Sequence, residues 1–520
     1  MMRFVRKLFV LTLACAMVLG AACAQAEATY KDEIHIAANT VPETFDLAYT
    51  TSTMGMTMTL GSVFEALVTI DSNYNIKPEL AESFTISDDF KTYTYVLRQG
   101  VKFHNGESLT PEDVVASMNR WIELTGAVKA AVGDSRFTKV DDKTVQIVFE
   151  KPVLYLNEMI TKMAQRPIIV PLSVIGAADP ATGVIKEYIG TGPYKFAEWV
   201  TVQYVKLVRN DDYVPYAPEG ETDGWYGYRY AATPTVIYDI VKDDSTRTAG
   251  MLSGEYDVAM NMPLDDYDVF PEDEFISHTE IGGEMCMIYN KRQGIASNPV
   301  FRQAVNAALD MEAIMTAANG DAKFFDLTSS YQSLHNSPWY SEAGKEYYNQ
   351  ANPEKAKELL AEAGYNGEEF KILFGNAYQQ FYKAGVEVQA ELTAAGVNCT
   401  LDIVDWSTYL ANSQDPTKFD AFITSFAIKA VPTLFTYLSP TWGGWCDDPA
   451  MVDGLAYINS AESVPAAIAK WQELQEYCWK EYVPISKFGT TLGYTISINT
   501  IEDYDFFEGM HAWNIKVIDD

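Results

Sequence analysis

Residues 352–404 carry two strand signals separated by one helix signal, and this spacing limits the fold more than any other feature. FKILF (370–374) is a short apolar run typical of a buried strand, and VNCTLDIV (397–404) alternates as a half-buried strand does. The helix predicted between them ends at Gly396. Strands joined through a helix pair in parallel, since a parallel connection needs a crossover of about a dozen residues or more. The segment therefore predicts a βαβ unit.

Further strands are predicted along the chain, so the expected fold class is α/β in its mixed α+β form, with helices on the faces of mixed sheets. Alternating or apolar runs mark these strands at 34–38, 92–103, 144–152 and 204–210. A chain of 520 residues is too long for one ordinary core, so we expect two or three domains.

The amino-terminal segment predicts export from the cytoplasm. Arg3, Arg6 and Lys7 precede an uncharged apolar run over residues 8–22, and small residues follow. Ala24-Gln25-Ala26 suits cleavage before Glu27, so residues 1–26 are interpreted as a signal peptide. A competing interpretation makes Cys23 the lipidated first residue of a lipoprotein. Both predict a mature protein in the periplasm or on the outer face of the cytoplasmic membrane.

Composition and motifs exclude several functions. The formal net charge of −33 disfavours nucleic-acid binding. The sequence contains no GxxxxGK[ST] loop, no HExxH and no GxSxG, and its five His are scattered. We therefore expect no catalysis, no cofactor and no metal. DSNYNIKPELAE (71–82) places acids and amides at calcium-loop spacing, but Ile76 stands where that loop needs Gly.

Cysteine spacing in the mature chain leaves two interpretations open. Cys286, Cys399, Cys446 and Cys478 follow the signal segment and form no CxxC pattern. An exported protein can hold one or two disulfides, and free buried thiols are the alternative.

The polar stretch GVKFHNGESLTPEDVV (100–115) is explained by structure and not by catalysis. Asn105-Gly106 predicts a tight turn. Thr110 is placed as a helix cap, Pro111 suits the first helical position, and Asp113 can reach back to the cap.

Several segments in order resemble family 5 of the extracellular solute-binding proteins, the peptide- and nickel-binding components of ABC importers. The resemblance covers nearly all of the mature chain and rests on the following segments: LAESFTISDDFKTYTYVLRQGVKFHNGESLTPEDVVASMNR (80–120), GTGPYKFAEW (190–199), TRTAGMLSGEYDVA (246–259), NPVFRQAVNAALDMEAI (298–314), NPEKAKELLAEAGY (352–365), DWSTYL with KFDAFITSF (405–426) and ELQEYCWKEYVPISKFG (473–489).

The resemblance implies a type II periplasmic-binding-protein fold with two lobes, a hinged cleft and an extra third domain. Lobe I is expected from residues 27–57, 185–287 and 490–520, and lobe II from residues 288–489. Residues 58–184 form the extra domain, packed on lobe I. Hinge closure then encloses the ligand. The implied partners are an ABC permease and its ATPase, and we expect a monomer.

The resemblance implies ligand-binding residues in the segments that border the cleft in that family, and several tryptophans are added as candidates for stacking on the ligand. They are Asn39, Thr40, Val41, Glu43, Trp121, Met285, Met287, Trp406, Ser425, Phe426, Lys429, Trp442 and Trp445.

One departure from the family pattern bears on the ligand. Peptide binders of this family place an Asp four residues before the Pro of this segment, where it captures the α-ammonium group. Counting back from Pro432 gives Ile428, with Lys429 beside it. A buried ammonium without a counter-charge costs several kcal/mol. Short peptides are the expected ligand on family resemblance, and an oligosaccharide or another non-peptide solute is the alternative. A secreted hydrolase and a chaperone-like or sensor module are the other function classes.

Overall fold

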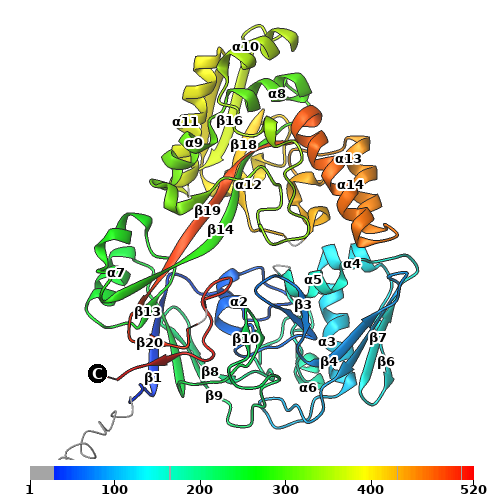
Figure 1. The fold of residues 1–520 in the computed structure, drawn as a ribbon, viewed down its shortest axis with the longest axis vertical. Coiled ribbons are helices and arrows are strands. Elements are labelled where there is room, and N and C mark those ends of the chain that lie inside the picture. The colour runs from blue at the N-terminus through cyan, green and yellow to red at the C-terminus, as the bar shows by residue number, and fades with distance from the viewer. Residues whose placement is uncertain (1–28, 163–164, 377, 430, 505, 520) are drawn as a thin grey trace, which may run out of the picture.

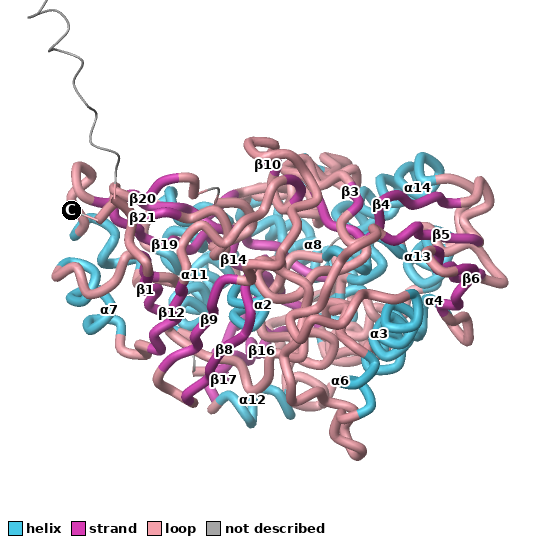
Figure 2. Tube along the Cα trace, turned by 90° about the horizontal axis from the view of Figure 1, so that it is seen from below, coloured by secondary structure: helices cyan, strands magenta, loops and turns pink. Residues whose placement is uncertain are grey.

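The computed structural model describes residues 29–162, 165–376, 378–429, 431–504 and 506–519. The predicted signal peptide and Cys23 lie outside these residues. Figure 1 shows two bodies joined by a pair of long strands, with a third part beside the lower one. Figure 2 places that third part at one end of the molecule and α7 (Asp244–Leu252) at the other.

One mixed sheet runs through both bodies and has 11 strands within the described residues. In spatial order they are β17 (Asn398–Val404), β16 (Glu369–Gly375), β18 (Ala421–Phe426), β14 (Phe275–Tyr289), β19 (Ile485–Ile498), β13 (Val258–Ala259), β1 (Glu33–Ala38), β12 (Thr235–Ile240), β9 (Tyr204–Arg209) and β8 (Tyr194–Val200), with β15 (Phe325–Asp326) paired to β19. This mixed sheet with its covering helices confirms the predicted fold class.

The upper body contains the predicted βαβ unit. Strands β16 and β17 pair in parallel from Glu369↔Asn398 to Gly375↔Val404, and helix α11 (Gln379–Ala395) joins them. Gly396 ends α11 with a φ of 98°, a left-handed conformation that glycine adopts without strain. The other helices of the upper body are α8 (Pro299–Ala308), α9 (Met311–Asn319), α10 (Pro353–Glu362), α12 (Trp406–Asn412), α13 (Pro449–Asn459) and α14 (Val464–Tyr477).

The lower body consists of β1, β8, β9, β12 and β13 with α7. Here β1 pairs in parallel with β12 and β13, and β12 pairs antiparallel with β9. The chain's last segment returns to this body through β20 (Ile501–Glu502) and β21 (Lys516–Val517). Helix α2 (Thr53–Thr59) and the small hairpin of β10 (Thr222–Asp223) and β11 (Tyr226–Gly227) complete it.

The third part, here called the side domain, spans residues 81–176. Its four-stranded sheet has the order β4 (Ala81–Ile86), β5 (Thr92–Leu97), β7 (Thr144–Val148) and β6 (Phe137–Asp141). Helices α3 (Pro111–Leu124), α4 (Gly126–Val132), α5 (Leu156–Lys162) and α6 (Leu172–Gly176) accompany it, and the hairpin β2 (Val68–Ile70) and β3 (Ile76–Pro78) leads into it.

The long antiparallel strands β14 and β19 connect the two bodies (Figure 1). Their register shifts between Ile281 and Glu284, where Gly282 and Gly283 form an irregularity. The Thr491 hydroxyl accepts from the Gly283 N–H at 2.9 Å and would lie 2.6 Å from a Cβ added at Gly282. We propose this crossing as the hinge, and the predicted domain boundaries remain a proposal.

Local contacts explain the polar stretch 100–115 as predicted. Thr110 and Asp113 form a reciprocal capping box at the start of α3. The Asp113 carboxylate also accepts from the Leu172 N–H at 2.8 Å, which ties α3 to α6. Gly106 has a φ of 88°, as the predicted turn requires.

His104 links this stretch to the segment 190–193. Its Nδ1 accepts from the Gly190 N–H at 3.2 Å, so its Nε2 donates to the Gly192 carbonyl at 3.0 Å. Burial lowers the pKa of His104 to about 4, which keeps the ring neutral. A second proton on Nδ1 would face the Gly190 N–H and break that hydrogen bond.

Acidification is therefore expected to destabilise the protein through His104. The unfolded ring takes up a proton near its ordinary pKa and the folded ring only near 4, so the free energy of unfolding falls as pH drops between these values. This one group contributes a loss of about 2 kcal/mol between about pH 7 and pH 5. Urea unfolding across this range measures it.

His104→Asn is the matched control, because an amide can accept from Gly190 and donate to Gly192 without titrating. The variant is expected to show a shallower fall than the wild type. Burial also lowers the pKa of His278 to about 4 and of His511 to about 3, so part of the fall remains. Equal slopes for the two proteins would contradict the role of His104.

Contacts explain the role of Asp71 in the segment 71–82 and decide the state of the four cysteines. The Asp71 carboxylate accepts from the Asn73 and Asn75 N–H groups at 3.0 and 2.8 Å and pairs with Lys77 at 3.2 Å, so it closes the turn of the β2–β3 hairpin. The cysteines at 286, 399, 446 and 478 are free and buried.

Within the described part of the chain, none of the helices has the length and apolar character to cross a membrane.

Candidate ligand-binding cavity

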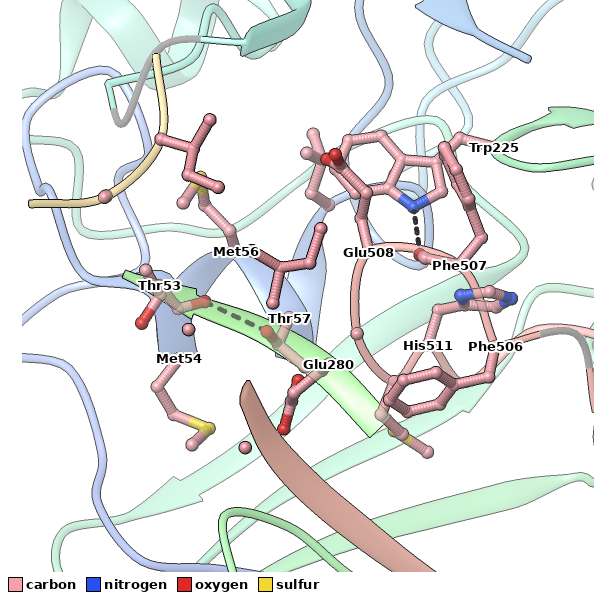
Figure 3. A pocket seen from close by; sticks show the side chains of 18 of the residues that line it. Thr53, Met54, Met56, Thr57, Trp225, Glu280, Phe506, Phe507, Glu508 and His511 are labelled. Atoms are coloured by element: carbon pink, nitrogen blue, oxygen red, sulfur yellow. Dashed lines mark hydrogen bonds between the residues drawn. The ribbon is translucent and has the colours of Figure 1, made fainter. Parts of the chain in front are cut away.

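A cavity of about 540 Å³ lies where the two bodies meet at the crossing strands. Figure 3 shows α2 on one side, the loop 506–513 on the other and Glu280 of β14 between them. The lining residues are Thr51, Thr53, Met54, Met56, Thr57, Leu60, Tyr74, Arg166, Trp225, Met260, Asn261, Thr279, Glu280, Ile281, Gly282, Leu334, Ala427, Ile428, Lys429, Gly493, Phe506, Phe507, Glu508, Gly509, Met510, His511 and Trp513. The size suits a small ligand.

Helix α2 supplies an uncharged wall. Its cap is Ser52, whose hydroxyl accepts from the Gly55 N–H at 3.3 Å. This helix packs against the chain before it, because a Cβ added at Gly55 would lie 3.4 Å from the Pro42 ring, an ordinary van der Waals distance. Met56 and Thr57 line the cavity beside each other on this helix (Figure 3). The methionine offers an adaptable apolar surface.

Aromatic rings form a second wall, and each of two tryptophans packs against a buried arginine. Trp225 donates from Nε1 to the Phe507 carbonyl at 3.1 Å, and the Arg166 guanidinium lies 4.9 Å from its ring centre. Arg229 lies 4.8 Å from the Trp513 ring. These cation–π contacts fix the rings that face the ligand space.

His511 adds a polar atom to this wall. Its ring stacks on Trp513 at 3.8 Å with an interplanar angle of 14°. Burial lowers its pKa to about 3, and the ring hydrogen-bonds to the backbone of Gly509. Nδ1 of this neutral ring is buried and has no hydrogen-bond partner among the described residues. It can accept one hydrogen bond from an N–H or O–H of a ligand.

Two acidic and two basic side chains line the cavity: Glu280, Glu508, Arg166 and Lys429. Glu508 hydrogen-bonds to Tyr74, which together with burial raises the pKa of that tyrosine. Burial lowers the pKa of Arg166 to about 10. Lys429 belongs to the upper body and Glu508 to the loop 506–513 of the lower body, so the cavity carries charges from both bodies.

The bodies also touch apart from the crossing strands. Tyr155 of the side domain donates from its hydroxyl to the Ile458 carbonyl at 3.2 Å. Its ring meets that of Trp339 edge-on, with centres 5.0 Å apart, and both residues are buried. This contact belongs to a hydrophobic cluster that extends from the side domain into the upper body.

The structure places Lys429 at the cavity, next to Ile428, where the aspartate of the family pattern is missing. Asn39 lies near the cavity, because its Oδ1 accepts from Nδ2 of the lining residue Asn261 at 3.3 Å. Ser425 and Phe426 directly precede the lining segment 427–429. Thr40 and Glu43 are exposed outside the lining, and Val41 packs on the lower core.

The remaining predicted ligand residues pack in hydrophobic cores and do not line this cavity. Trp121, Met285 and Met287 are fully buried, and Trp445 is 5% exposed. Trp406 and Trp442 pack against the same core as Trp445. The physical reason is that a large apolar side chain on a core-facing position of a strand or helix gains more from burial than from the cleft surface.

Most of the lining residues were not predicted from the sequence. Trp225 belongs to the aromatic-rich segment 223–230, and neither this segment nor 506–513 belongs to the family motifs found in the sequence. The available signal for the segment 506–513 was its several aromatic residues close to Gly509. Glu280 lies two residues before Gly282-Gly283, and a glycine pair within a strand is typical of an irregularity or of a close approach to another group.

A family model described as "Bacterial extracellular solute-binding proteins, family 5 Middle" matches residues 75–447. A probable peptide ABC transporter periplasmic-binding protein, y4tO of Sinorhizobium fredii, is 28% identical over 474 residues, with 86% of each chain covered.

Two solved structures share the fold. The oligopeptide-binding protein AppA of Bacillus subtilis, solved with a nonapeptide, has a TM-score of 0.71 and 20% identity and covers 95% of this chain and all of its own. AgaA of A. tumefaciens R10, solved with agropinic acid, has a TM-score of 0.73 and 23% identity and covers 94% and 99%. These similarities concern the fold.

Proposed function

The chain belongs to family 5 of the bacterial extracellular solute-binding proteins, and on this premise we propose that it captures short peptides and delivers them to an ABC importer. The cavity between the two bodies is the proposed binding site. Closure of the bodies about β14 and β19 holds the peptide, and the closed form docks on the permease. The binding protein performs no chemistry on its ligand.

The observation that carries this proposal is the position of the cavity. Its lining comes from both bodies, from α2 and the 506–513 loop below and from Leu334 and the segment 427–429 above. A ligand there contacts both and favours the closed arrangement by its differential affinity. Charges of both signs, aromatic rings and the free Nδ1 of His511 match the termini, side chains and N–H groups of a peptide.

The test is a thermal-shift screen of purified residues 27–520 against peptides of two to five residues, oligosaccharides and Ni²⁺. A ligand that binds only the folded protein stabilises it by about 2.7 kcal/mol at about 100 times its Kd. We expect peptides to raise the melting temperature and the other classes to leave it unchanged. No shift with any peptide pool would refute the peptide assignment.

The same samples address hydrolysis. Chromatography of the peptides after incubation with the pure protein is expected to return them intact. Cleavage that co-purifies with the folded protein would support a secreted hydrolase instead.

A non-peptide solute is the second candidate, and one observation favours it. Ile428 stands at the cavity where peptide binders of the family hold an aspartate. AgaA, which shares the fold, was solved with agropinic acid and not with a peptide. An oligosaccharide, or agropinic acid itself, that shifts the melting temperature more than any peptide would favour this candidate.

Location and assembly follow from the family and remain part of the proposal. We propose an exported monomer in the periplasm or on the outer face of the cytoplasmic membrane. Residues 1–26 act as the signal peptide, and Cys23 is the alternative lipid attachment site. Mass spectrometry of the mature amino terminus distinguishes cleavage before Glu27 from lipidation at Cys23.

A further inference from the structure

Two charged side chains at the cavity have no ion-pair partner within the described part of the chain: Glu280 below and Lys429 above. Among the described residues, the Glu280 carboxylate accepts one hydrogen bond, from the Thr495 hydroxyl at 3.3 Å. The Lys429 carbonyl accepts from Nε2 of Gln332 at 2.7 Å, whereas its ammonium lies in the field of the Glu284 carboxylate without forming an ion pair. Glu284 already lies 3.4 Å from the Lys487 ammonium. Both side chains are partly buried.

Several other buried charges in the described residues have a partner. Arg229 pairs with Glu79, Arg120 pairs with Asp46, and Lys487 lies 3.4 Å from Glu284. Arg302 donates to the backbone carbonyls of Tyr482, Val483, Ala296 and Ser297. A charge removed from water without a partner is costly, so uncompensated charges at a cavity point to a partner supplied from outside.

The other ionisable groups at the cavity are already engaged. Glu508 hydrogen-bonds to Tyr74. Arg166 packs on Trp225 and lies in the field of Glu508. Glu280 and Lys429 therefore differ from their neighbours, and they approach the cavity from different bodies. Glu280 lies on β14, two residues before Gly282, whereas Lys429 follows β18.

We propose that the ligand is a zwitterion whose cationic group binds Glu280 and whose anionic group binds Lys429. This inference rests on the proposed function and makes it more specific. For a peptide with free ends, the ammonium lies against the lower wall beside the crossing strands. The carboxylate then meets the segment 427–429, where the family's peptide binders hold the ammonium. The orientation of the peptide across the cavity is the reverse of theirs.

This assignment also predicts a separation between stability and binding. Burial raises the pKa of Glu280, so its ionised form lowers the stability of the empty protein above its ordinary pKa. Glu280→Gln is therefore expected to keep or raise the melting temperature of the empty protein while it weakens binding. A merely structural glutamate would lose stability when changed.

The experiment pairs blocked ligands with single variants. The probes are a mixed tripeptide pool with free ends, the same pool N-acetylated, and the same pool with C-terminal amides. Affinity is measured by titration calorimetry for the wild type, Glu280→Gln and Lys429→Met. Glu272→Gln and Lys357→Met, both at exposed positions outside the cavity, are the matched controls.

We expect N-acetylation to weaken binding to the wild type and to both controls by about tenfold or more, and to have no effect on Glu280→Gln. Amidation is expected to weaken binding to the wild type by about tenfold, and to have no effect on Lys429→Met. Each pairing is a thermodynamic cycle that assigns one end of the ligand to one residue.

The outcomes separate the two proposals. If none of the pools binds the wild type, the peptide assignment itself fails. If the free pool binds and Glu280→Gln still discriminates against acetylation, the zwitterion proposal is overturned while the peptide function stands. The zwitterion proposal is also overturned if Glu508→Gln abolishes the discrimination against acetylated peptides and Glu280→Gln does not. The ammonium site is then Glu508, and the peptide function stands.

Discussion

Replacing Arg229 by methionine is expected to lower the free energy of unfolding by about 3–5 kcal/mol, the cost of leaving one member of a buried ion pair alone. Arg229 is fully buried beneath the cavity, and its guanidinium contacts the Glu79 carboxylate and the Trp225 carbonyl. The same group packs on Trp513 and Tyr216, with ring centres 4.8 and 5.4 Å away. The change therefore removes a charge partner and a support of the aromatic wall.

The loss in Arg229→Met should depend on pH in a defined direction. Burial raises the pKa of Glu79 to about 7 even beside Arg229, and removing the arginine raises it further. A carboxyl whose folded pKa lies above its unfolded value contributes stability at low pH that is lost as pH rises. The deficit against the wild type is therefore expected to be larger near pH 8 than near pH 5.

Urea unfolding at the two pH values measures both effects. The double variant Arg229→Met with Glu79→Leu is expected to recover much of the loss, since removing both charges avoids an isolated one. Lys516→Met is the control, because its pair with Asp503 is partly exposed and worth about 1 kcal/mol or less. A loss in Arg229→Met no greater than in Lys516→Met would contradict the prediction.

Replacing Gly190 by alanine is expected to lower the free energy of unfolding by about 3 kcal/mol, at the upper end for overpacking. A Cβ at Gly190 would lie 2.0 Å from the Val63 carbonyl oxygen, and a backbone atom cannot rotate away. The Gly190 carbonyl also accepts from the His104 N–H at 3.0 Å. One methyl group therefore forces apart the segments around Val63 and Gly190.

Gly126→Ala is the matched control for Gly190→Ala. Gly126 starts α4, and an added Cβ there meets nothing within 4 Å. The control is expected to be neutral or stabilising by up to about 1 kcal/mol, because alanine restricts the unfolded chain. Thermal or urea unfolding of both variants decides the matter, and equal stabilities would contradict the close approach at Gly190.

Local elements could be predicted from neighbouring residues because their causes are local. The capping box of Thr110 and Asp113 depends on residues three apart, and the stop at Gly396 depends on one residue's freedom. The parallel pairing of β16 and β17 follows from the helix between them. The family resemblance added the two-body arrangement, and the match over residues 75–447 confirms the family.

The candidate site was predicted much less well. Lys429 reached the cavity because its segment carries a family landmark at Pro432. Trp121 and Met285 did not, since alternation along an element does not tell whether a face meets a core or a cleft. Trp225 and His511 belong to segments without a recurring spacing, and their aromatic residues alone did not tell that these segments line a cavity.

By itself the sequence determined the class of fold, the order of its elements and the family, because these depend on short-range periodicity, caps and motifs. Only the tertiary structure decided which charges are compensated. Glu79 and Arg229 are 150 residues apart and pair. Glu280 and Lys429 come from different bodies, and neither has an ion-pair partner among the described residues, although both line the cavity. Such compensation depends on distances between segments remote in the chain, and a linear sequence does not contain those distances.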